Sequence, residues 1–184
     1  VIAGYARLVS LGHAALFGIT AYATGYMLQA GFGHPLAIVV ALLIGLASMA
    51  LYAVLSLRAT GIGFIMITLA LGEIVWGLAY RWISITGGDN GISLHGRPEP
   101  FGIALTSATG FYYTTLIVFA ISVVLVTIFE QSPLGTALMG VRDQPRRMNA
   151  LGYHVWAIRF WACMFSGLLT SIAGILFVYY TQFI

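Results

Sequence analysis

The sequence has 184 residues, of which 60% are apolar and 7% are charged, and its formal net charge is +3. A soluble domain is about a quarter charged, so this composition excludes a chain that covers itself with a water-facing surface. All eight basic residues are arginines and form no stripe on a soluble face, which excludes a nucleic-acid-binding protein. The single cysteine, Cys163, excludes an internal disulfide.

Long apolar runs define the expected fold. No Asp, Glu, Lys or Arg occurs from Leu8 to Leu57 or from Phe160 to Ile184. About 20 apolar residues cross the hydrocarbon core of a bilayer as a helix. The pattern predicts an all-α polytopic membrane protein, one transmembrane domain over residues 1–184, with about five spans. The expected spans are 8–29, 35–57, 62–83, 111–130 and 157–180.

Small residues recur at helical spacing in the first and last spans. They are Ala14, Gly18 and Gly25 in the first, and Gly167, Ser171 and Gly174 in the last. Small residues allow helices to approach closely in lipid, so we expect these six to form helix-packing faces. His13 has no second His, Cys or acid at metal-ligand spacing, which predicts an interfacial histidine with satisfied hydrogen bonds rather than a metal ligand.

Glu73 is an ionisable residue in the middle of the third span. Such a group costs about 2.5–3.5 kcal/mol on insertion scales and usually faces protein or water. One interpretation is that Glu73 lines or braces a polar translocation path, with Thr68, Gly72, Thr86 and Asn90. The other interpretation is a buried carboxyl group that hydrogen bonds to a neighbouring helix for structural reasons.

The loop expected over 84–110 is rich in glycine and proline, and its segment 86–91 is expected to bend sharply near the outer membrane surface. It lacks the Gly-Lys-Ser/Thr of a phosphate-binding P-loop. The chain also lacks the Gly-x-Ser-x-Gly and His-Glu-x-x-His motifs. We therefore expect no catalytic residue and no metal site.

The segment 132–159 contains four of the eight arginines and one acid, Asp143. A short basic loop between apolar spans lies on the cytoplasmic side by the positive-inside rule. Arg7 and Arg58 fall on the same side if five spans alternate. The amino end is therefore expected inside and the carboxyl end outside.

Within this segment the spacing predicts one helix over 136–151, ended by Gly152. One interpretation is that this basic helix contacts a soluble partner and receives force from a cytoplasmic motor. The alternative is a loop that only sets the topology. Because the chain begins at Val1 without a methionine and stops at Ile184 within a span, we expect a longer protein that is truncated at both ends.

Four motifs follow one another in an order and spacing that cover nearly the whole chain. They are Ser10–Gly18 followed by Ala21-Tyr22, Thr68–Glu73, Thr86-Gly87-Gly88 with Asn90-Gly91, and Gly135–Gly152 ending in Asn-Ala-Leu-Gly. Together they resemble LivM-like permeases of branched-chain amino-acid ABC importers.

This resemblance implies a permease subunit that moves branched-chain or other small amino acids across a bacterial or archaeal inner membrane. The implied partners are the lipid bilayer, a second homologous permease, two cytoplasmic ATPase subunits that bind ATP and Mg, and an outer solute-binding protein. No cofactor is implied for this subunit, and no nucleic acid.

The resemblance also implies that residues 142–151 form the coupling helix that docks into the ATPase. The residues expected there are Arg142, Asp143, Arg146, Arg147, Asn149 and Gly152. Where relatives tend to have Ala-Ala-Glu, this chain has Arg147-Met148-Asn149, with Pro145 just upstream. The helix is therefore expected to start near Pro145 and to present a different charge to the ATPase.

Other functions stay open at this point. An ABC importer of the same kind could instead carry urea, short amides or aromatic acids. An ion-coupled carrier or channel could use Glu73 as its ion or proton site, although the chain shows no internal repeat of the kind found in many such carriers. A structural membrane subunit without a path of its own is the third class.

Overall fold

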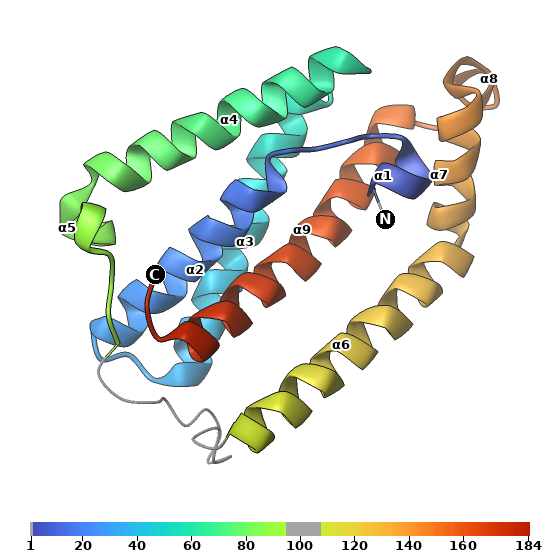
Figure 1. Cartoon of the computed structure of the whole chain (residues 1–184). Coiled ribbons are helices and arrows are strands. Elements are labelled where there is room, and N and C mark those ends of the chain that lie inside the picture. Colours follow the sequence, from blue (N-terminus) through green and yellow to red (C-terminus); the bar gives the residue numbers. More distant parts are fainter. Residues whose placement is uncertain (1, 95–107) are drawn as a thin grey trace.

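The computed structural model describes residues 2–94 and 108–184, which are folded almost entirely as α-helices (Figure 1). The long helices are α2 (His13–Gln29), α3 (His34–Ser56), α4 (Ile62–Arg81), α6 (Ala108–Gln131) and α9 (Val155–Thr181). Shorter elements connect them: α1 (Ile2–Ala6), α5 (Ile83–Thr86), the 3₁₀ helix η1 (Gly88–Asn90), α7 (Pro133–Asp143) and α8 (Pro145–Ala150).

Four helices among the described residues, α3, α4, α6 and α9, are long and apolar enough to cross a membrane. Each occupies one of the expected spans, and the predicted all-α polytopic membrane class is confirmed. Helix α2 occupies the remaining expected span with 17 residues, which is the short end of the range for a spanning helix.

Helix α2 begins later than predicted, at His13 instead of Leu8. The preceding linker leaves α1 through a left-handed turn at Arg7, whose φ is 50°. The Leu11 N–H then donates to the Thr68 hydroxyl of α4 at 3.3 Å instead of to a helical carbonyl. A linker fixed in this way cannot continue the helix toward the amino end.

Helices α2, α3 and α9 pack side by side and form the core of the molecule (Figure 1). At their centre, Gly45 of α3 lies so close to Thr20 of α2 and Ser171 of α9 that a Cβ atom would overlap both side chains. Both hydroxyls donate to carbonyls of their own helices, Thr20 to Phe17 at 2.9 Å and Ser171 to Gly167 at 2.8 Å. The contact therefore brings three backbones together and leaves neither hydroxyl unsatisfied.

Helices α4 and α6 lie on opposite sides of this core (Figure 1). Helix α4 buries Phe64 and Thr68 and leaves most of its surface exposed. Helix α6 has no buried residue in its apolar window. Its end is held by α7 and by Phe129, whose ring stacks on Phe165 with the centroids 4.4 Å apart.

The chain bends sharply after α4, at the segment 86–91 where the sequence predicts a bend. Gly87, Gly88 and Gly91 all have positive φ angles, of 74°, 57° and 63°, which only glycine adopts easily. Residues 92–94 then pair with 182–184 at the end of α9. The Ile92 N–H donates to the Ile184 carbonyl at 2.9 Å, and the Ile184 N–H donates back at 3.1 Å. The rest of the expected outer loop lies outside the described residues.

Candidate functional site

The basic segment folds as two helices, α7 and α8, so the single helix expected over 136–151 is wrong. The break falls at Gln144, which has φ −143° and ψ 77°. Pro145 causes it, because the proline ring excludes the helical region for the residue before it. The predicted end of the helical segment is confirmed, since α8 ends at Ala150 and Gly152 has a φ of 89°.

Helix α7 is embedded in the molecule. Its Ser132 cap accepts a hydrogen bond from the Gly135 N–H at 3.2 Å. Leu138 and Val141 are each 1% exposed and belong to the same apolar cluster as Ala6 of α1. Helix α7 is therefore packed against both α1 and the core.

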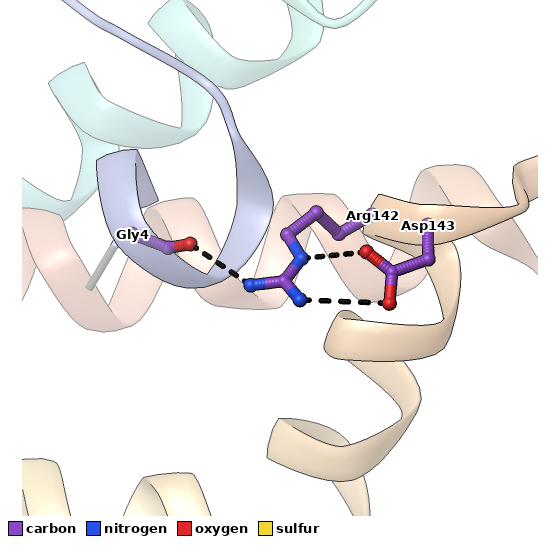
Figure 2. Close-up of polar contacts among 3 residues, drawn as sticks. All are labelled: Gly4, Arg142 and Asp143. Carbon is purple, nitrogen blue, oxygen red and sulfur yellow. Dashed lines mark hydrogen bonds and ion pairs between the residues drawn. The ribbon is translucent and has the colours of Figure 1, made fainter.

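Arg142 and Asp143 are the last two residues of α7 (Figure 2). The Arg142 Nε donates to Asp143 Oδ1 at 2.9 Å, and its Nη1 donates to the Gly4 carbonyl of α1 at 3.4 Å. The hydrogen bond from Arg142 lowers the pKa of the Asp143 carboxyl, and the charge of Arg7 acts in the same direction. Arg142 thus joins α7 to α1, and Asp143 holds the Arg142 side chain.

Helix α8 has no buried residue. Arg146, Arg147 and Asn149 are exposed, and neither arginine forms an ion pair with another described residue. Met148 fixes α8 in place, because its sulfur lies against the backbone of Gly140. Five of the six residues expected in the coupling helix (Asp143, Arg146, Arg147, Asn149 and Gly152) are exposed, and the sixth, Arg142, is half-buried and pairs with Asp143.

The five residues expected along a path are not brought together. The Thr68 hydroxyl donates to the Ile65 carbonyl at 2.9 Å and accepts from Leu11, so its bonding capacity is used within the chain. The Thr86 hydroxyl is used in the same way, at 2.6 Å from the Ala79 carbonyl. Gly72 lies near Ala15 of α2, whereas Glu73 and Asn90 are exposed.

Of the six residues expected in helix-packing faces, four lie in close contacts and two do not. Gly167, Ser171 and Gly174 lie in the three-helix core, against side chains of α2 and α3. Gly25 lies against Ile92 and Ile184, where residues 92–94 pair with 182–184. Ala14 is exposed, and no described atom lies near a Cβ built on Gly18. The buried face of α2 consists of Leu16, Thr20, Ala21, Thr24 and Gly25.

The sequence analysis did not predict the hydrogen-bond partners of His13 or the partial burial of Arg159. His13 joins three segments, because its Nδ1 lies 3.0 Å from the Ser10 hydroxyl of the linker and its Nε2 lies 3.0 Å from the Ser166 hydroxyl of α9. Its hydrogen bonds are satisfied, as predicted, but the partner in α9 is too distant in sequence to be foreseen. Arg159 is half-buried near the start of α9, and its Nε has no hydrogen-bond partner among the described residues.

Comparison with known proteins tests the resemblance seen in the motifs. A family model described as the permease component of branched-chain amino acid transport systems matches residues 1–184. The high-affinity branched-chain amino acid transport system permease protein LivM of Salmonella typhimurium is 26% identical over 201 residues, which cover 96% of this chain and 47% of the relative.

LivM of Escherichia coli K12 is 27% identical over the same length and with the same coverage. The chain spans about half the length of these relatives. No solved structure matches it significantly. Because the family model covers the whole chain, the chain belongs to the family of permease components of branched-chain amino acid transport systems.

Proposed function

We propose that this chain is part of the permease subunit of an ABC importer that carries branched-chain or other small amino acids across a bacterial or archaeal inner membrane. The observation that supports it best is the exposure of α8. This helix presents Arg146 and Arg147 without partners among the described residues, and α7 anchors it to the core. An exposed basic helix on a rigid support is suited to contact a soluble motor.

In this proposal two cytoplasmic ATPase subunits bind ATP and Mg, and one of them docks on α8. Closure of the ATPase pair displaces α8 and with it α7. The displacement reaches α1 through Arg142 and the core through Leu138 and Val141. The membrane helices then change between outward and inward states because the ATPase contacts differ in free energy between them.

A second homologous permease and an outer solute-binding protein complete the proposed assembly. The binding protein captures the amino acid first, so the residues described here carry little information about the cargo. Glu73 is exposed on α4, which is compatible with a path at the surface of the subunit. The variant Glu73→Gln tests whether Glu73 lines the path. Full uptake at normal expression would make Glu73 a structural residue.

The first experiment is substrate uptake by the complete transporter in membrane vesicles. Uptake of branched-chain amino acids is expected to require ATP inside the vesicle and to persist when a proton uncoupler is added. An ion-coupled carrier that uses Glu73 would give the opposite result, with uptake abolished by the uncoupler in the presence of ATP.

The second experiment reverses the charges on α8. The double variant Arg146→Glu/Arg147→Glu is expected to lower ATP-driven uptake by about tenfold or more, because like charges or unpaired charges then face the ATPase contact. Arg58→Glu is the matched control, since Arg58 is also exposed and is expected on the same membrane side. Equal uptake by the double variant and the control would argue that the basic segment only sets topology.

A further inference from the structure

The linker between α1 and α2, residues 7–12, is held by α3 and α4 at the end next to α2. The Leu11 N–H donates to the Thr68 hydroxyl of α4 at 3.3 Å. Gly12 is buried, and a Cβ atom on it would lie 2.7 Å from the ring of Tyr52 in α3 and 3.0 Å from the Thr68 carbonyl oxygen. This end of the linker is therefore in tight contact with both helices.

His13 adds a contact with α9. Its Nδ1 lies 3.0 Å from the Ser10 hydroxyl of the linker, and its Nε2 lies 3.0 Å from the Ser166 hydroxyl of α9. A neutral imidazole donates through one nitrogen and accepts through the other, and a hydroxyl can do either, so both bonds can form with either tautomer. Residues 10–13, which we call the His13 node, thus contact α3, α4 and α9.

The opposite end of the same stretch of chain lies against α7. Helix α1 packs on α7, and the Arg142 Nη1 donates to the Gly4 carbonyl at 3.4 Å. Ala6 and Leu8 are each 5% exposed and belong to the apolar cluster that contains the buried side chains of α7. Figure 1 shows the linker crossing from α1, beside α7, to the start of α2. Residues 2–13 therefore run from the support of α8 to the His13 node.

We infer that residues 2–13 form a strap that transmits the displacement of α7 to the membrane helices, and that His13 is the positioning residue that holds this strap to α9. The inference rests on the proposed function, in which an ATPase displaces α8 and α7. The apolar contacts of α7 with the core are non-directional, so they leave the direction of its movement open. The hydrogen bonds of the His13 node depend on distance and angle, so they fix which way the strap moves α9.

The first test removes the bond between His13 and α9 in the complete transporter. Ser166→Ala removes the hydroxyl of α9, and the measurement is the number of ATP molecules hydrolysed for each amino acid imported into vesicles. This ratio is expected to rise several-fold, because the ATPase still closes but its movement reaches α9 only in part. Thr170→Ala is the matched control and is expected to leave the ratio unchanged, since the Thr170 hydroxyl donates to the Ser166 carbonyl of its own helix at 3.0 Å.

The ratio separates transmission from folding. A purely structural role would lower the amount of folded transporter, which reduces ATP hydrolysis and import together and leaves their ratio unchanged. An unchanged ratio in Ser166→Ala would therefore overturn the inference. Import by the unmodified transporter that needs no ATP would instead reject the proposed function itself.

A second test lengthens the strap and keeps every side chain. Two glycines inserted after Val9, which is exposed in the linker, are expected to raise the same ratio several-fold because the added slack absorbs the movement of α1. The same insertion after Gly31, in the exposed turn between α2 and α3, is the matched control. Equal ratios for the two insertions would overturn the inference, also in the case that Ser166→Ala fails to fold.

Discussion

At the scale of the residue, the closest contact in the core depends on the absence of one side chain. Gly45 lies between Thr20 and Ser171, so α3 can approach α2 and α9 only without a Cβ atom at this position. The spacing of Gly167, Ser171 and Gly174 in the sequence indicated a small face, and the structure places that face in the core. The sequence could not show which helix lies opposite, because lipid and a neighbouring helix both accept an apolar surface.

Substitution of glycine by alanine therefore has opposite effects at two positions. Gly45→Ala is expected to destabilise the protein by about 1–3 kcal/mol, the usual cost of overpacking. Gly18→Ala is the matched control, since it lies in a helix with no described atom near its Cβ, and alanine favours helix over glycine by about 0.5–1 kcal/mol. Thermal unfolding in detergent measures both variants. An equal loss of stability at the two positions would contradict the core contact.

At the scale of the element, the break at Gln144 separates α7, which has buried residues, from α8, which has none. The sequence contains the signal for this break, because Pro145 excludes a continuous helix through Gln144. The spacing of the segment predicted one helix over 136–151, which is wrong, whereas the helix start expected near Pro145 is confirmed by α8. The pairing of Arg142 with Asp143 and with the Gly4 carbonyl was not predictable, because it depends on where α1 lies after folding.

Removal of the proline tests whether the break matters. Pro145→Ala is expected to let α7 continue into α8, which rotates Arg146 and Arg147 away from their present direction. ATP-driven uptake should fall severalfold while the yield of folded protein is unchanged. Pro133→Ala at the first turn of α7 is the control, since a proline there replaces no helical hydrogen bond. Normal uptake by Pro145→Ala would show that the direction of α8 is unimportant.

At the scale of the whole molecule, hydropathy predicted the helices well and their arrangement poorly. The expected spans match α2, α3, α4, α6 and α9 because a bilayer of fixed thickness requires apolar helices of a limited length. No such constraint determines neighbours, so the separation of α4 and α6 from each other was not foreseen. The chain spans about half the length of the relatives it matches.

The orientation of the whole molecule is a prediction from the distribution of arginines. Gln144 and Asn90 are both exposed and lie in segments predicted on opposite sides of the membrane. A membrane-impermeant thiol reagent is expected to label Asn90→Cys in intact cells, and to label Gln144→Cys only after the cells are opened. Labelling of Gln144→Cys from outside would invert the orientation and remove the basis for the ATPase contact.

The backbone pairing of residues 92–94 with 182–184 brings together two segments that are far apart in the sequence. Helices α6, α7, α8 and α9 all lie between the paired segments, which are held together by backbone hydrogen bonds at the end of α9 that is far from α8 (Figure 1). A push on α8 can therefore tilt α6 and α7 without separating these segments. We expect the junction to stay closed when α6, α7 and α8 move, because α9 is packed in the core and its end is bonded to residues 92–94.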